Sequence, residues 1–221
     1  MINIQELENR IINADCMDIL KQLPDKCIDL VLTDPPYGIG SSFKSKFGLQ
    51  VAYKKYDKFD WNNSIPSEEV FKEIIRVSKN QIIFGGNYYT KFLEPTNSWI
   101  VWDKIGNYNL KNPFSDCELA WTSFTCTMKK YTHVSMGFIA GKEEKGNRIH
   151  PTQKPVDLFG EILRDYSKEN DLVLDCFSGS GTTAIACHRL NRRFICIEKD
   201  KEYWEASTKR LQEQQRQGVL F

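Results

Sequence analysis

The 221-residue chain lacks the features that mark several classes of protein. Its seven cysteines include no Cys-x-x-Cys pair, and its three histidines have no zinc-like spacing, which is typical of reduced thiols in the cytoplasm and predicts no metal site. No apolar run approaches the roughly 18 residues of a membrane span, and the acidic start MINIQELENR is not typical of a signal peptide. The formal net charge is only +1, so any nucleic-acid surface must be local. We therefore expect a cytoplasmic protein without a membrane segment.

The hydrophobic pattern predicts one α/β domain over residues 1–221. Apolar runs that end in turn residues predict strands over 10–14, 28–33, 81–86, 98–104, 117–123, 133–139 and 172–176, with a last strand that ends at Glu198. Helical faces are predicted over 16–23, 66–79, 156–168, 181–190 and 201–216. Because no long helix separates the middle strands, we expect a mostly parallel sheet with an antiparallel edge.

The stretch DCFSGSGTTA, residues 175–184, lies between a predicted strand and a predicted helix. Gly179, Ser180 and Gly181 allow a tight turn that approaches a ligand, and the helix start offers N–H groups to a negative group. The spacing Gly179-x-Gly181-x-x-Ala184, followed by Glu198 at the end of the next strand, fits a loose dinucleotide-binding pattern. No Gly-x-x-x-x-Gly-Lys-Ser/Thr loop occurs. An adenosine-bearing ligand is therefore favoured, and its kind stays open at this point.

A second motif, LTDPPYG at residues 32–38, ends the predicted strand 28–33. Strand ends in a doubly wound sheet point at the ligand crevice, so we expect Asp34 beside the glycine loop. The Asp34 carboxylate and the Pro35 carbonyl are acceptors, Pro36 shapes the turn, and Tyr37 offers a flat face. These groups suit a planar heterocycle with an NH2 group, whose nitrogen lone pair they would direct towards an electrophile. Stacking of a base on an aromatic ring is worth about 1–3 kcal/mol, which would offset much of the cost of extruding it from a duplex.

Together, DPPYG (34–38), HPTQKP (150–155) and DLVLDCFSGSGTT (171–183) resemble motifs of the S-adenosylmethionine-dependent DNA amino-methyltransferases. Their order resembles the beta group, in which the catalytic tetrapeptide precedes the cofactor loop in a permuted form of the fold. The resemblance covers most of the chain from Ile11 to about Leu211. It implies a Rossmann-like methyltransferase fold, with a mostly parallel seven-stranded twisted sheet, an antiparallel edge and helices on both faces. It also implies direct methyl transfer to an amine without a metal.

The resemblance implies a role for each matching position. Asp34, Pro35 and Tyr37 would hold the target base, and Pro36 would shape the turn. Asp175 would bind the amino group of the methionine part of the cofactor, and Glu198 would take the ribose hydroxyls. The other implied cofactor contacts are Asp15 and Cys16 at the adenine end, Phe177, Ser178, Gly179, Ser180 and Gly181 in the loop, Thr182 and Thr183 near the carboxylate, and Thr152 and Lys154 approaching that carboxylate from the other side.

The first residue of the tetrapeptide bears on the substrate. In the resembled family an aspartate there usually accompanies adenine N6, whereas a serine accompanies cytosine N4. We therefore expect an N6-adenine methyltransferase that acts on double-stranded DNA by base flipping. The alternatives are a cytosine-N4 enzyme on the same fold, an RNA or protein amide methyltransferase and, from a different class, a dinucleotide-binding module or dehydrogenase.

Two long polar segments are candidates for contact with DNA. Residues 38–64 follow the catalytic turn directly, and we expect a mobile loop over the active site. Residues 105–149 are expected to form a recognition insert, smaller than that of larger relatives. Candidate phosphate-binding residues are Lys44, Lys46, Lys54, Lys55 and Lys58 in the loop, with Lys129 and Lys130 in the insert. With so small an insert, a homodimer would supply additional contact area.

Overall fold

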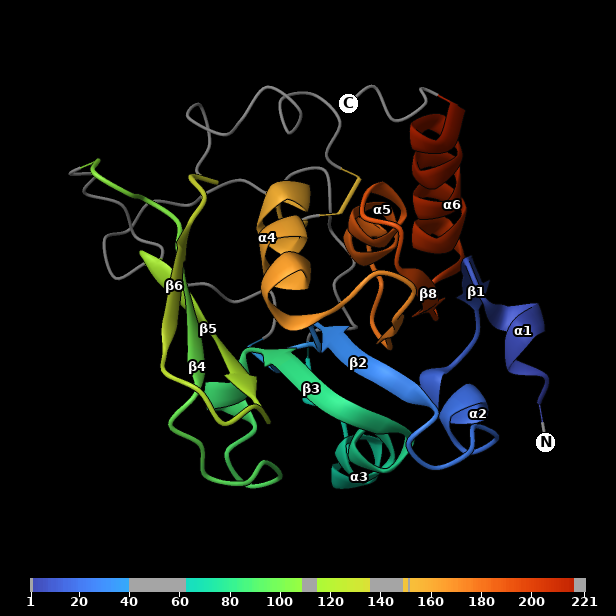
Figure 1. The fold of residues 1–221 in the computed structure, drawn as a ribbon, viewed down its shortest axis with the longest axis horizontal. Helices are drawn as coiled ribbons and strands as arrows, with labels where there is room; N and C mark the ends of the chain where they lie inside the picture. Colours follow the sequence, from blue (N-terminus) through green and yellow to red (C-terminus); the bar gives the residue numbers. More distant parts are fainter. Residues whose placement is uncertain (1, 40–62, 109–114, 136–148, 151, 217–221) are drawn as a thin grey trace.

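An eight-stranded sheet runs through the part of the chain that the computed structural model describes, which is residues 2–39, 63–108, 115–135, 149–150 and 152–216. Helices cover both faces of this sheet (Figure 1). The strands are β1 (Arg10–Asn13), β2 (Ile28–Thr33), β3 (Ser78–Phe84), β4 (Trp99–Asp103), β5 (Cys117–Thr122), β6 (Lys129–Thr132), β7 (Leu172–Asp175) and β8 (Arg193–Glu198). The helices are α1 (Ile4–Leu7), α2 (Cys16–Leu20), α3 (Glu68–Val77), α4 (Val156–Tyr166), α5 (Thr182–Arg189) and α6 (Lys201–Arg216), with a 3-10 turn η2 (Gly86–Tyr88).

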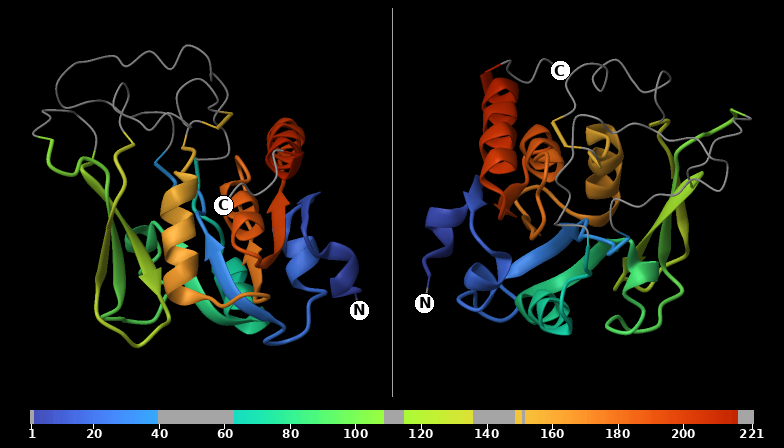
Figure 2. Two further views of the ribbon diagram at one scale, coloured as in Figure 1. Left: turned by 45° about the horizontal axis from the view of Figure 1, so that its top comes forward. Right: turned by 180° about the vertical axis from the view of Figure 1, so that it is seen from behind.

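The strands lie in the order β1-β8-β7-β2-β3-β5-β4-β6. The first five are mutually parallel, β5 is antiparallel to both of its neighbours, and β6 runs parallel to β4. Two views of the ribbon show β4, β5 and β6 at one end of the sheet and α1 at the other (Figure 2). Since parallel strands all end at the same edge, the carboxyl ends of β1, β8, β7 and β2 meet there.

Two hydrophobic cores, one on each face, hold the helices to the sheet. Helices α4, α5 and α6 cover one face, and α2 and α3 cover the other. Phe159 of α4 stacks on Phe84 of β3, with ring centroids 5.3 Å apart. On β2, Leu30 and Leu32 face the first core, whereas Val31 faces the second. The strand is therefore a continuous apolar run, as expected for a parallel strand buried on both faces.

The predicted fold class is confirmed: the sheet is mostly parallel, has an antiparallel edge and carries helices on both faces. The implied count of seven strands differs from the eight found among the described residues. The strand expected at 133–139 is wrong at its start, because residues 133–135 are not in a strand and β6 precedes them. β6 has the sequence KKYT, in which only Tyr131 is buried, so hydrophobic periodicity does not reveal it. Residues 136–139 lie outside the described residues.

Most of the predicted loop 38–64 and much of the predicted insert 105–149 also lie outside the described residues, including Lys44, Lys46, Lys54, Lys55 and Lys58. The described part of the insert contains β5 and β6, which are strands of the main sheet. Lys129 and Lys130 are exposed on β6, and Lys130 pairs with Asp103 at 3.2 Å. Their role in DNA binding stays a prediction.

Candidate active site

One buried hydrogen bond joins the two motifs that the sequence singles out. The Thr33 hydroxyl, at the end of β2, donates to Asp175 Oδ1, at the end of β7, over 2.7 Å. Both side chains are buried, and β2 and β7 are neighbouring parallel strands. Because Asp34 follows Thr33 directly, the turn of residues 34–37, here called the DPPY turn, lies beside the start of the glycine loop (residues 176–181). The expected proximity of the two motifs is therefore present in the structure.

Two carboxylates, those of Asp175 and Glu198, accept hydrogen bonds from the glycine loop and from the start of α5. Asp175 Oδ1 also accepts from the Phe177 amide at 3.0 Å, and Asp175 Oδ2 accepts from the Thr183 hydroxyl at 2.5 Å. Glu198, at the end of β8, accepts from the Gly179 amide at 2.7 Å. Gly181 has a φ of +74° as it leads into α5, a left-handed conformation that favours glycine. These hydrogen bonds, together with the left-handed backbone of Gly181, hold the segment as a strand, a tight turn and a helix.

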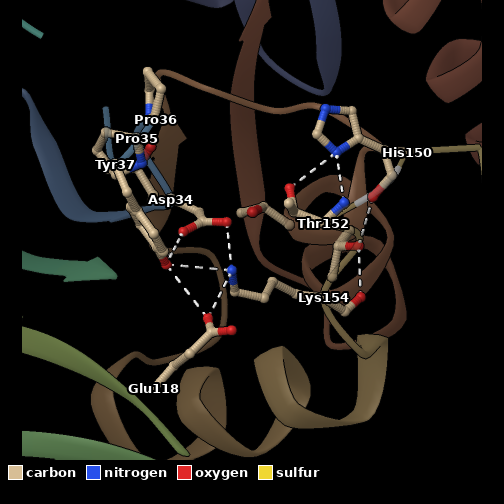
Figure 3. A network of polar contacts seen from close by, with 12 residues as sticks. Asp34, Pro35, Pro36, Tyr37, Glu118, His150, Thr152 and Lys154 are labelled. Atoms are coloured by element: carbon tan, nitrogen blue, oxygen red, sulfur yellow. Dashed lines mark hydrogen bonds and ion pairs between the residues drawn. The ribbon is translucent and has the colours of Figure 1, made fainter. Parts of the chain in front are cut away.

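The Asp34 carboxylate belongs to a polar network that comes from three separate elements (Figure 3). Its Oδ1 accepts from the Tyr37 hydroxyl at 2.7 Å, and its Oδ2 pairs with Lys154 Nζ at 2.5 Å. Lys154 precedes α4, and its Nζ also lies 3.1 Å from Glu118 Oε2 on β5. The side chains of Asp34 and Lys154 are only 18% and 6% exposed. Each Asp34 oxygen thus already has one partner, and each keeps room for a second donor.

The charged groups of this network shift one another's pKa values. Burial raises the pKa of Asp34, a rise that the Lys154 charge opposes and the Glu118 charge reinforces. Burial alone would raise the pKa of Glu118, but the charges of Lys154 and Lys104 outweigh it and lower that pKa to about 2. Burial alone would lower the pKa of Lys154, but Asp34 and Glu118 raise it. The network therefore holds a charged lysine between two carboxylates.

The ring of Tyr37 is held between neighbours rather than standing free. It stacks on Tyr88, with centroids 4.8 Å apart and planes 14° from parallel. Gly85, with φ +68°, packs so tightly that an added Cβ would lie 2.2 Å from Tyr37 Cε1. Tyr88 is 43% exposed and is the outer ring of the pair. The flat face expected of Tyr37 is therefore shared with Tyr88, which the sequence analysis did not single out.

The backbone of the DPPY turn is fixed by a buried tyrosine. The Tyr89 hydroxyl lies 2.8 Å from the Pro35 carbonyl oxygen and 2.9 Å from that of Pro36, and the two carbonyl groups share its single proton. Tyr89 is fully buried against Phe71 of α3, with ring centroids 4.9 Å apart. The direction of the Pro35 carbonyl is thus set by a hydrogen bond as well as by the proline rings.

Residues 88–209 match the family described as DNA methylase. The chain is 30% identical to the type II methyltransferase M.HinfI of Haemophilus influenzae, covering 96% of this chain and 70% of the relative. The chain belongs to the DNA methylase family. The resemblance to the DNA amino-methyltransferases is confirmed.

Solved structures of DNA methylases support the same fold. The crystal structure of an M1.HpyAVI–SAM complex has a TM-score of 0.60 and 26% identity, covering 91% of this chain and 98% of that one. The structure of the cytosine-N4-specific PvuII DNA methyltransferase has a TM-score of 0.56, covering 94% and 91% of the two chains. Its 17% identity shows the shared fold alone.

The remaining predicted cofactor residues of this DNA methylase gather at the same edge of the sheet. Asp15 caps α2 through the Met17 amide and pairs with Lys199 at 2.8 Å, so it lies near the end of β8. The following Cys16 is buried. The residues of the glycine loop and the start of α5 are mostly buried: Ser178, Ser180, Thr182 and Thr183, with Phe177 and Gly179 partly exposed. Their cofactor contacts stay predictions.

The Lys154 side chain belongs to the network around Asp34. Its ammonium group reaches Asp34 and Glu118, and its backbone carbonyl accepts from Thr182 Oγ1 at 3.0 Å. Its expected contact with the cofactor carboxylate stays a prediction. Thr152 is exposed and contacts His150, which packs over Gly179. Burial and the Lys154 charge lower the pKa of His150 to about 4, so this imidazole is neutral near pH 7.

Sequence reasoning missed Glu118, Tyr88 and Tyr89. Glu118 carries no motif, and only the antiparallel pairing of β5 with β3 brings it to the DPPY turn. The adjacent tyrosines after QIIFGG offered a faint signal, because Gly85 and Gly86 lead the chain from β3 into η2 at the sheet edge. Within the described residues no cluster of His, Cys, Asp and Glu could hold a metal ion. No helix in the described ranges is both long and apolar enough to cross a membrane.

Replacing Gly85 tests the packing of Tyr37. We expect Gly85→Ala to destabilise the protein by about 1 kcal/mol or more and to slow methyl transfer, because the new Cβ clashes with the Tyr37 ring and the backbone has positive φ. Gly160→Ala on α4 is the control, since its Cβ meets no heavy atom closer than 3.8 Å and alanine favours a helix. Urea unfolding and transfer of labelled methyl groups measure both effects. Equal stability of the two variants would contradict the described packing.

Removal of the Asp175 charge tests the burial of this carboxylate. Burial raises its pKa to about 6, although hydrogen bonds from Thr183, Thr33 and the Phe177 amide oppose the rise. A raised native pKa means that stability is lost as the pH rises from about 4 to about 6. Relative to Asp175→Asn, the wild type should lose about 2–3 kcal/mol of unfolding free energy between pH 4 and pH 7. Denaturant unfolding at both pH values measures the difference, and a difference that does not change with pH would refute it.

Proposed function

We propose that this DNA methylase transfers a methyl group from S-adenosylmethionine to the N6 amine of adenine in double-stranded DNA. The observation that carries the proposal is the hydrogen bond between Thr33 and Asp175, which holds the DPPY turn beside the glycine loop. A group that grips an amine and a loop suited to an adenosine-bearing cofactor thus share one edge of the sheet. Membership of the family supports DNA as the substrate.

The residues at the glycine loop fit the cofactor. No side-chain cap closes the start of α5, so its first amides suit the carboxylate of a methionine part. The carboxylate of Glu198 is partly exposed beside Gly179 and suits ribose hydroxyls. S-adenosylmethionine supplies an electrophilic methyl group on a sulfonium sulfur. The related M1.HpyAVI protein was crystallised in complex with the same cofactor.

In this proposal the DPPY turn grips the amine of an extruded base. Asp34 and the Pro35 carbonyl accept its two N–H bonds through the acceptor sites that their present partners leave open. The lone pair of the amine then points out of the ring plane. The base stacks against the pair of Tyr37 and Tyr88, where Tyr88 is the exposed ring that it meets first. The negative charge of Asp34 favours the positive charge that develops on the nitrogen during transfer.

The choice of adenine rests on the aspartate at the first position of the tetrapeptide. Cytosine N4 is the second candidate, because the same acceptors would hold any exocyclic amine and the PvuII enzyme, which shares the fold, is cytosine-N4-specific. Phosphate contacts by Lys129 and Lys130, a mobile loop at 38–64, a recognition role for 105–149 and a homodimer belong to the same proposal. The last strand of the sheet order, β6, carries the two lysines.

Labelled cofactor decides between the two amines. Duplex DNA incubated with the protein and methyl-labelled S-adenosylmethionine, then digested to nucleosides, should contain labelled N6-methyladenine. Label in N4-methylcytosine would instead establish the second candidate. Binding of NAD without affinity for S-adenosylmethionine would refute the assignment to methyl transfer.

Asp34→Ala should slow methyl transfer on the order of 10²-fold or more while the affinity for cofactor stays near that of the wild type, because the residue grips the substrate amine. Asp29→Asn is the matched control, since Asp29 is also an aspartate of the β2 region paired with a lysine, Lys79, at 2.6 Å. Single-turnover transfer and equilibrium cofactor binding separate the two effects. Near-normal turnover of Asp34→Ala would remove Asp34 from the chemistry.

Glu198→Ala should act on the cofactor instead. Its Oε2 accepts from Gly179 and its Oε1 from the Asp200 amide, so the variant loses loop order together with any ribose contact. We expect the dissociation constant of S-adenosylmethionine to rise about tenfold or more, with a smaller change in turnover at saturation. Isothermal titration measures the constant. An unchanged affinity would place Glu198 outside the pocket.

A further inference from the structure

Lys154 is buried in the candidate active site, and its positive charge takes no part in the proposed reaction as described so far. Its ammonium group lies 2.5 Å from Asp34 Oδ2 and 3.1 Å from Glu118 Oε2 (Figure 3). The three side chains come from the DPPY turn, from β5 and from the segment before α4, so the fold brings them together from distant parts of the sequence. Breaking a buried ion pair leaves a costly unpaired charge, so the arrangement depends on all three groups.

Aromatic rings also surround the ammonium group. Lys154 Nζ lies 5.6 Å from the ring centroid of Tyr37, 5.4 Å from that of Phe84 and 5.8 Å from that of Trp102. These distances are within the range of cation–π attraction. The ammonium group is therefore held in place from several directions, and it fixes one oxygen of Asp34 while the Tyr37 hydroxyl fixes the other.

Asp34, Glu118 and Lys154, here called the cluster, combine two carboxylates with one lysine. Asp34 and Glu118 with Lys154 carry a net charge of −1, from two negative charges and one positive. Lys104 pairs with the other oxygen of Glu118, Oε1, at 3.1 Å. The four side chains together are therefore neutral, with the second positive charge on Glu118 and not on Asp34. If Lys154 faced Asp34 alone, its charge would cancel the negative charge that a positively charged target nitrogen needs.

We propose that Lys154 and Glu118 form a positioning pair for Asp34. Lys154 orients the Asp34 carboxylate and keeps it ionised, so that it acts as an acceptor. Glu118 offsets the positive charge of Lys154. The cluster therefore keeps a negative charge beside the target nitrogen, which becomes positive during transfer. This inference rests on the proposed function, because the target amine is the substrate of that reaction. Neither residue touches the amine in this proposal; both act through Asp34.

The pair predicts opposite effects of its two members on the ionisation of Asp34. The groups that face Asp34 are Tyr37 from its own turn, Tyr89 after η2, Glu118 from β5, Lys154 before α4 and Asp175 from β7. Loss of the positive charge in Lys154→Met should move the acidic limb of the turnover–pH profile upward by about 1–3 units. Loss of the negative charge in Glu118→Gln should move that limb downward and lower the plateau, because Lys154 then neutralises Asp34.

The double variant Lys154→Met/Glu118→Gln keeps the cluster at −1, and its acidic limb should lie between those of the single variants. Lys79→Met, which breaks an exposed lysine–aspartate pair at the other end of β2, is the matched control and should leave the limb unchanged. The carbon-13 resonance of the Asp34 carboxyl group, assigned by its loss in Asp34→Asn, reports the same ionisation without cofactor or DNA. Its midpoint should move in the same directions. Circular dichroism shows whether each variant is folded.

The two readouts separate this inference from the proposed function. In a folded and active enzyme, the positioning pair alone would be overturned if Lys154→Met and Glu118→Gln both moved the acidic limb and the resonance midpoint in one common direction. It would also be overturned if neither variant moved them. Should Lys154→Met fail to fold, Glu118→Gln and the double variant still show in which direction each charge moves the acidic limb. A wild type that transfers no methyl group would overturn the proposed function and the role in transfer. In that case, opposite shifts of the Asp34 carboxyl resonance in Lys154→Met and Glu118→Gln would still support the conclusion that the pair controls the ionisation of Asp34.

Discussion

The hydrogen bond between Thr33 and Asp175 is the constraint on which the rest of the site depends. It joins the last residue of β2 to the last residue of β7 inside the protein, where both groups are shielded from bulk water. The residues that follow each strand are therefore held at a fixed separation. A backbone ladder fixes the distance between the strands, and this side-chain bond links the two strand ends at the level where the turns begin.

The turn that follows Thr33 is stiff for a related reason. Pro35 and Pro36 have fixed φ angles and no N–H donors, so they add no competing hydrogen bond beside Asp34. The Tyr89 hydroxyl then sets the direction of their carbonyl groups, and Gly85 lets the Tyr37 ring approach the backbone. The stiffness of the turn thus comes from the prolines together with packing from the segment after β3.

How much of this could be predicted depended on whether a signal was local. The DPPY turn and the glycine loop are continuous motifs at the ends of apolar strands, and the sequence located both and predicted that they lie together. Glu118 and the direction of the Lys154 side chain depend on the antiparallel addition of β5, whose register with β3 no local pattern reveals. β6 was not predicted, because a polar edge strand with a single buried residue, Tyr131, has no apolar period.

The acceptors of the DPPY turn are already engaged within the protein, and this bears on the amine binding that we propose for them. Asp34 and the Pro35 carbonyl each hold a partner, yet a carboxylate oxygen and a carbonyl oxygen each offer two lone pairs. A free carboxylate would have to be oriented when the substrate binds, at a cost in side-chain entropy. Here that cost is met during folding, because the internal donors already fix the acceptors. The same bonds that occupy the acceptors therefore leave their second lone pairs in fixed directions, which is the arrangement that an incoming N–H group requires.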